Sequence, residues 1–145
     1  MTVSIDPQEK WLYVATGDGW KKVVGMTCAI NGLKCSAFFE LTEDKGRFIA
    51  VSELSSGYSI CNIPLNLLTA LMCDTKAKAL DLMRVKLEDL SKMLMDDKSI
   101  TMDDIASEAN AKLVEYVDKF GPMPPIEIMD DFNRSKLWRT SNETN

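Results

Sequence analysis

Hydrophobic and polar residues alternate with a period of two between residues 10 and 63, and this pattern predicts β-strands. The apolar stretches are rich in β-branched and aromatic residues, and Gly, Asn, Asp or Ser separates each stretch from the next. Short separations favour hairpins, so we expect an antiparallel meander of about five strands. The expected strands are residues 10–15, 20–30, 33–41, 47–54 and 58–63.

After Pro64 the pattern changes to a helical period, first in a short apolar run and then in two longer segments. Asp74 or Thr75 is the expected N-cap of the first long helix, and Thr101 that of the second. Gly121, followed by proline, is a typical helix stop. The first long helix has an apolar stripe at spacings of three and four, made of Leu80, Met83, Leu87, Leu90 and Leu94.

These segments predict an α+β fold, in which two to three helices pack on one face of the sheet. Residues 1–121 are expected to form a single domain, with the sheet in residues 10–63 and the helices in residues 64–121. A chain of 145 residues can form a core without disulfide or metal staples. The proline-rich stretch after residue 121 predicts a hinge, and residues 122–145 are expected to be a C-terminal tail.

Two cysteines lie symmetrically about an Asn-Gly pair, which is the strongest short-range signal for a two-residue hairpin. With Asn31 and Gly32 as the turn, Cys28 lies opposite Cys35. The same register places Cys61 about 10 Å from Cys35 across the sheet. That separation is too large for a shared zinc ion with bonds of about 2.3 Å. We therefore expect core cysteines, with a redox-active pair of Cys28 and Cys35 as the alternative.

The register also divides the side chains between two faces of the sheet, because they alternate along each strand. The helix with the Leu80 to Leu94 stripe is expected to cover one of these faces. This expected core face contains Trp11, Tyr13, Val24, Met26, Cys28, Cys35, Phe39, Ile49, Val51, Cys61 and Ile63.

The opposite, outer face is also apolar, although a solvated sheet face normally carries polar residues. Two interpretations remain open: the third helix or the tail covers it, or it is an interface with a protein partner or a second copy. If it is an oligomer interface, Phe38→Glu should split the oligomer. The expected partner-binding residues are Val23, Phe38, Phe48, Leu54, Tyr58 and Ile60, together with Phe132, Trp138 and Arg139 of the tail, which are residue types favoured at interfaces.

A second candidate surface combines positive charge with an aromatic ring. Lysines can contact phosphates while an aromatic side chain stacks on a base. This surface predicts, as an alternative function, the binding of a small ligand, a nucleotide or single-stranded nucleic acid. Its residues are Trp20, Lys21, Lys22 and Lys34.

Composition narrows the chemistry. The chain has 22 acidic and 17 basic residues, a net charge of -5, and so lacks the basic excess of proteins that neutralise many phosphates. It contains no histidine, which excludes Ser-His and Cys-His nucleophile systems and imidazole metal sites. An acidic loop at Glu43 and Asp44 is the weak basis for a third alternative, a carboxylate- or metal-dependent enzyme. No cofactor or metal is expected.

These observations fit best a non-enzymatic binding or inhibitory protein that acts through protein–protein contacts. We expect it to bind a protein partner or to form a homo-oligomer, as a phage-type accessory protein that blocks or sequesters a host defence factor would do. The sequence has no run of roughly 18 apolar residues and no signal-like start. The expected location is therefore the cytoplasm, or the host cytoplasm if the protein is viral, without membrane association.

Overall fold

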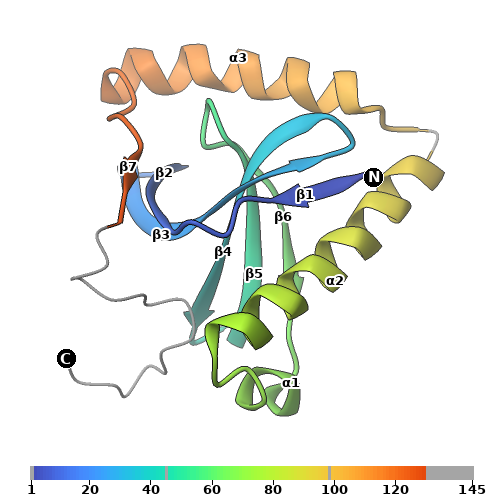
Figure 1. Cartoon of the computed structure of the whole chain (residues 1–145). Helices are drawn as coiled ribbons and strands as arrows, with labels where there is room; N and C mark the ends of the chain where they lie inside the picture. Colours follow the sequence, from blue (N-terminus) through green and yellow to red (C-terminus); the bar gives the residue numbers. More distant parts are fainter. Residues whose placement is uncertain (1, 45, 98, 130–145) are drawn as a thin grey trace.

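The computed structural model describes residues 2–44, 46–97 and 99–129. Within them the chain has the predicted α+β fold, an antiparallel sheet followed by helices (Figure 1). The sheet has the strand order β6-β5-β4-β3-β2-β7, and β1 also pairs with β3. The strands are β1 (Val3–Ile5), β2 (Lys10–Thr16), β3 (Gly19–Ile30), β4 (Leu33–Thr42), β5 (Gly46–Glu53), β6 (Ser59–Pro64) and β7 (Glu127–Ile128).

The helices begin and end at the residues that favour such boundaries. The side chains of Asn66, Thr75 and Thr101 each accept a backbone N–H bond in the first turn of a helix. Thr101 and Asp104 form a reciprocal capping box, and Gly121 ends the last helix with a φ of 82°. The predicted starts at Thr75 and Thr101 and the predicted stop are confirmed. The helices are α1 (Leu67–Leu71), α2 (Lys76–Asp96) and α3 (Met102–Phe120).

The β3–β4 hairpin has the predicted two-residue turn, with φ values of 50° at Asn31 and 87° at Gly32. Cys28 lies opposite Cys35, as predicted, and both cysteines are free. The turn is also bound to α2: the Ser91 hydroxyl donates to Asn31 Oδ1 over 2.6 Å, and Asn31 Nδ2 donates to the Ser91 carbonyl over 3.2 Å. The residue that sets the register of this hairpin therefore also positions a helix.

The register of the outer hairpins agrees with the prediction except near the end of β5. There the register shifts after Val51, so that Ser52 pairs with Ser59 and Ile60 is the extra residue of a β-bulge. Ile60 consequently packs with the core on the opposite face from the one expected. Residues expected on the same face do pair across neighbouring strands, as Trp11–Val24, Phe39–Ile49 and Val51–Cys61 show.

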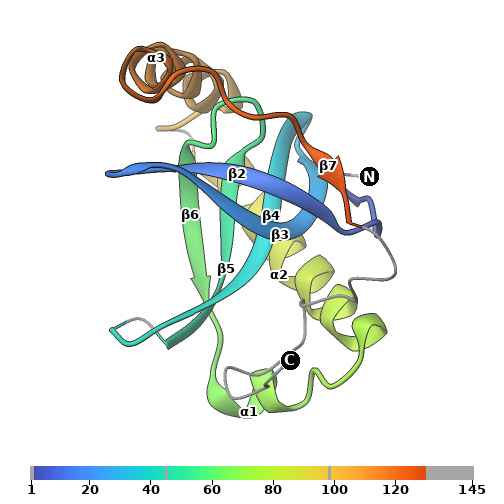
Figure 2. The same cartoon turned by 90° about the vertical axis from the view of Figure 1, so that its left-hand side faces the viewer.

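The sheet curls because β3 leaves β4 halfway along its length. Residues 26–30 pair with β4, whereas residues 19–25 pair with β2. At the crossing, a Cβ added to Gly25 would lie 2.5 Å from the Ala37 carbonyl oxygen and 2.8 Å from Phe38 Cβ, so only glycine permits this approach. On the N-terminal side of Gly25, the β2–β3 hairpin folds across the outer face of β4 and β5 (Figure 2).

The folded hairpin creates a second hydrophobic core on the outer face of the sheet. Leu12 is fully buried there, and Phe38 and Phe48 are each 4% exposed. The cover found for this face is the β2–β3 hairpin itself, which neither of the two interpretations named. For the same reason β2 buries Leu12 rather than the expected Trp11 and Tyr13. The second core consists of Leu12, Val14, Val23, Phe38, Phe48 and Ala50, with Leu54 packed against it.

The opposite face of the sheet carries the predicted core, and α2 covers it. Met83 and Leu87 of the predicted stripe are fully buried, and Leu90 is 8% exposed. They pack with Met26 and Ile49 of the sheet. The sheet thus has a hydrophobic core on each side, with a helix over one and a hairpin over the other.

The chain returns to the sheet after α3. Glu127 and Ile128 pair with β2, and the backbone N–H of the buried Met129 donates to the Glu9 carbonyl over 3.0 Å. Part of the segment expected to be a separate tail from residue 122 is therefore attached to the sheet by these hydrogen bonds. The remaining part of that segment, residues 130–145, lies outside the described residues.

The second core makes Phe38 a test of the corrected fold. We expect Phe38→Glu to unfold the protein, with a loss of more than about 4 kcal/mol, because a carboxyl group would replace a buried ring. Phe38→Leu, which keeps the site apolar, is the control and should cost less than about 2 kcal/mol. Urea denaturation followed by circular dichroism measures both. If the Phe38→Glu protein is instead folded and monomeric, Phe38 is not buried and lies on an exposed interface.

The crossing at Gly25 gives a second test. We expect Gly25→Ala to lower the free energy of unfolding by about 3 kcal/mol, because the added methyl group would meet backbone and core atoms. Gly17→Ala is the matched control, since an added Cβ there has no neighbour within 4 Å. It should change stability by no more than about 0.5 kcal/mol. Equal stabilities of the two variants in denaturant titrations would contradict the close crossing of β3 and β4.

Candidate functional site

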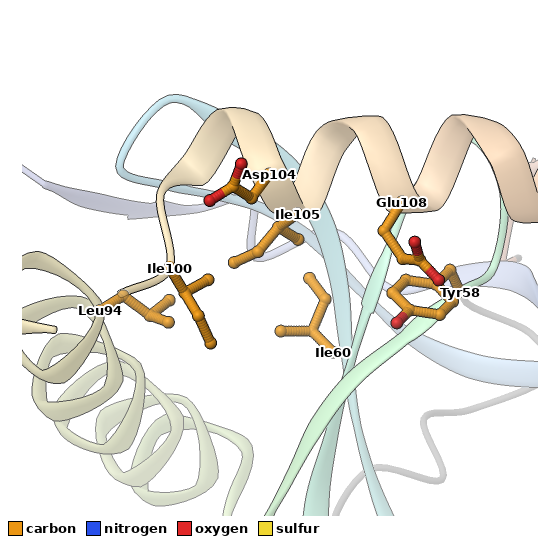
Figure 3. A pocket seen from close by; sticks show the side chains of 7 residues that line it. All are labelled: Tyr58, Ile60, Leu94, Ile100, Asp104, Ile105 and Glu108. Atoms are coloured by element: carbon orange, nitrogen blue, oxygen red, sulfur yellow. The ribbon is translucent and has the colours of Figure 1, made fainter. Parts of the chain in front are cut away.

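A pocket of about 290 Å³ lies between the C-terminal part of α2, the N-terminal half of α3 and β6. Its apolar side chains come from all three elements and from the loop before α3, and they point toward a common space (Figure 3). Two carboxylates lie on the α3 side of this space. The lining residues are Tyr58, Ile60, Leu94, Ile100, Asp104, Ile105 and Glu108.

Local structure explains how this pocket forms. The capping box of Thr101 and Asp104 sets where α3 starts, and this start places Ile105 and Glu108 on adjacent turns of one face. The β-bulge in β6 turns Ile60 toward the same space. The sequence placed Ile60 on the outer face of the sheet and did not predict that it meets Ile105.

The rim of the pocket is acidic. Asp104 Oδ2 accepts the Thr101 backbone N–H over 3.0 Å, so its carboxylate is held in place at the helix start. Within the described ranges, Glu108 has no ion-pair partner within 4.0 Å. Ile100, beside them, is 45% exposed. The pocket therefore offers an apolar floor and negative charge to a ligand or to a side chain of another protein.

A second exposed apolar surface is α1, at the opposite end of the molecule from α3 (Figure 1). None of its residues is buried. Leu67, Leu68, Leu71 and the C-cap Met72 are 68%, 70%, 62% and 64% exposed. The polar cap Asn66 fixes the helix start through a bond of 2.7 Å to the Thr69 N–H. The short apolar run after Pro64 was predicted to be helical, but its exposure was not.

The predicted ligand-binding residues are not assembled into a free stacking surface. The Trp20 ring packs edge-on against Tyr116 and Phe120, with centroid distances of 5.8 and 5.7 Å, and its Nε1 donates to the Gly121 carbonyl over 3.1 Å. Trp20 therefore attaches the end of α3 to β3 instead of facing a ligand.

Two of the three lysines of this candidate surface have separate partners. Lys21 forms an ion pair with Glu40, and the Lys22 amino group lies 4.6 Å from the centre of the Trp11 ring. Lys34 is exposed on β4. The structure thus does not join these charges with Trp20 into one site.

Six of the nine residues predicted to bind a protein partner lie among the described residues, and they are distributed over two environments. Val23, Phe38 and Phe48 lie in the second core, and Leu54 packs at its edge. Burial by the β2–β3 hairpin removes the first three from any surface contact in this conformation. Two more, Tyr58 and Ile60, line the pocket described above. The remaining three, Phe132, Trp138 and Arg139, lie outside the described residues.

The cysteines lie where the predicted core role places them. Cys28 and Cys35 are buried, and Cys61 and Cys73 are partly buried. Burial raises the pKa of the Cys28 thiol to about 12. Burial also raises the pKa of Cys35, with the neighbouring Cys28 as a secondary cause. A thiol with so high a pKa is protonated at neutral pH and is a poor nucleophile.

Among the described residues, no group of three or more His, Cys, Asp or Glu side chains is arranged to hold a metal ion. In the same part of the chain, none of the helices combines the length and the apolar character needed to cross a membrane.

The chain has an α+β fold, with a curled antiparallel sheet and a hydrophobic core on each face of the sheet. Comparison with protein-family models, with curated proteins and with solved structures gives no match for this chain. Its function must therefore be inferred from the surfaces described above.

The raised pKa of Cys28 predicts a loss of stability at alkaline pH. In the folded state Cys28 keeps its proton at pH values above the ordinary thiol pKa of 9.0. The stability that the folded state gains from the protonated, buried thiol is complete below pH 9.0 and is lost as the pH rises toward about 12. In that window each buried thiol should lower the free energy of unfolding by about 1.4 kcal/mol per pH unit. Denaturant titrations at a series of pH values measure the slope.

Cys28→Ala should make this pH dependence shallower, whereas Cys73→Ala, at a less buried thiol, should change it less. Identical slopes for the wild-type protein and the Cys28→Ala variant would contradict the assignment of Cys28 to the core. The comparison of slopes cancels the titration of lysines and tyrosines, which all variants share.

Proposed function

We propose that this chain is a non-enzymatic binding protein that acts through contacts with another protein, and that α1 is the centre of its contact surface. The observation that carries the proposal is that α1 buries none of its residues and exposes four large apolar side chains within two turns of chain. Apolar side chains that gather on the surface in this way are typical of protein interaction sites.

The structure around α1 supports a contact surface rather than a core element. The two hydrophobic cores are complete without it, because neither includes Leu67, Leu68, Leu71 or Met72. Burying these side chains in a partner would release roughly 25 cal/mol for each Å² of apolar area removed from water. Leucine and methionine side chains also adapt their shape to a partner surface.

An inhibitory action is the specific form of this function that we propose. A small protein that binds by an exposed apolar helix can cover the working surface of its partner and thereby block it. A phage-type accessory protein that sequesters a host defence factor would act in this way. The composition supports contact with protein rather than with nucleic acid, since the net charge is -5.

Substitution in α1 tests the proposal. We expect Leu68→Asp to weaken binding of the partner at least about thirtyfold, the effect of losing a contact worth about 2 kcal/mol. Val114→Asp on α3 is the matched control, because Val114 is 72% exposed and Leu68 is 70% exposed. Partners are isolated by affinity capture from the native host, and the affinity of the purified pair is measured by calorimetry. Equal affinities of the two variants would overturn the role of α1.

A further inference from the structure

The chain contains a segment whose chemistry complements the pocket between α2 and α3. Residues 134–139 have the sequence Arg-Ser-Lys-Leu-Trp-Arg, which places Leu137 and Trp138 among three cationic side chains with no acidic residue. The pocket presents apolar side chains from β6, α2 and α3, with the carboxylates of Asp104 and Glu108 at its rim. Apolar anchors flanked by cations match an apolar floor flanked by carboxylates.

The size of the pocket suits one large side chain. Its volume of about 290 Å³ is at the lower limit for small-molecule sites, which span roughly 300 to 1,000 Å³. A tryptophan side chain buries roughly 150 to 250 Å² and is among the commonest interface anchors. Tyr58 and the partly exposed Ile100 provide an aromatic and an aliphatic wall for the indole.

Chain geometry favours a second copy as the source of the segment. The pocket lies at the N-terminal half of α3, whereas β7 follows the C-terminal end of that helix (Figure 1). The lining residues Asp104 to Glu108 precede the end of α3 at Phe120 by 12 to 16 residues, roughly 18 to 24 Å at 1.5 Å per residue. From there β7 leads the chain away from α3, and the nine residues 130–138 span at most roughly 30 to 32 Å when fully extended. Within one chain Trp138 would reach the pocket only along a nearly extended path around the protein surface, whereas a second copy has no such constraint.

We propose that Trp138 and the flanking cations of residues 134–139 dock in the pocket of a second copy of this chain, with Trp138 on the apolar floor and Arg139 or Lys136 facing Glu108. Each copy carries this pocket and this segment, so a reciprocal exchange fills the pocket of each copy in a two-fold symmetric dimer. This interface is separate from α1 and does not depend on the function proposed for α1.

The experiment compares the self-association of full-length variants by sedimentation velocity over a range of protein and salt concentrations. The wild-type chain should form dimers that dissociate as salt rises, because the contact includes ion pairs at the protein surface. Trp138→Ala should weaken dimerisation about thirtyfold, the loss of a major anchor. Glu108→Lys should weaken it as well, whereas Asp118→Lys, the same charge change on α3 away from the pocket lining, should not.

Mixing two weakened variants separates docking from a general loss of structure. A Trp138→Ala chain keeps an intact pocket and a Glu108→Lys chain keeps an intact segment, so their mixture should form a heterodimer with one complete contact. Neither variant alone should associate as strongly. Circular dichroism melting of each variant verifies that it is folded.

Other outcomes overturn the proposal. A wild-type chain that is monomeric at every concentration excludes the exchange. If Trp138→Ala then still shifts the methyl NMR signals of Ile60 and Ile105 in that monomer, the segment occupies the pocket of its own chain. Dimers that tolerate both Trp138→Ala and Glu108→Lys place the interface elsewhere. If the Leu68→Asp variant loses partner binding but still dimerises, the result bears on α1 alone. The two proposals can therefore fail independently of each other.

Discussion

The close crossing of β3 over β4 at Gly25 is the constraint on which the rest of the structure depends. Because no side chain separates the backbone of Gly25 from Ala37 and Phe38, β3 can leave its partner strand and carry β2 over the outer face. The sheet thereby covers its own second face and needs no further layer there. The backbone N–H of Ala15 closes the arrangement by donating to the Gly57 carbonyl over 3.1 Å.

Two turns connect the cores to the elements around them. Asn31 binds the main chain and side chain of Ser91 on α2, so the β3–β4 turn positions the helix over the first core. In the β5–β6 turn the buried carboxylate of Glu53 accepts bonds from the backbone and hydroxyl groups of Ser55 and Ser56, the shortest 2.6 Å from the Ser56 hydroxyl. These bonds satisfy a charge that burial would otherwise make costly.

Occupation of both sheet faces leaves the helices to provide the surfaces for function. The first core uses α2 and the second uses the β2–β3 hairpin, so α1 and the groove between α2 and α3 remain exposed. Trp20 lies beside lysines in the sequence, which is typical of a ligand-binding surface. In the structure its ring packs against Tyr116 and its Nε1 donates to the Gly121 carbonyl, so it holds the end of α3. Function is therefore to be sought in the helical half of the chain.

The sequence by itself determined the α+β class, the order of the five longer strands β2 to β6, most of their register, the starts of the two long helices and the end of α3. These features depend on local chemistry: positive φ at Asn31 and Gly32, side-chain caps at Thr75 and Thr101, and the stripe through Met83 and Leu87. Only the tertiary structure decided what covers the outer face of the sheet and that Ile60 changes face at a β-bulge. It also decided that the residues lining the pocket, which come from β6, α2 and α3, lie together. Those outcomes depend on contacts between residues far apart in the chain, and alternation along one strand shows that a face is apolar without showing what covers it.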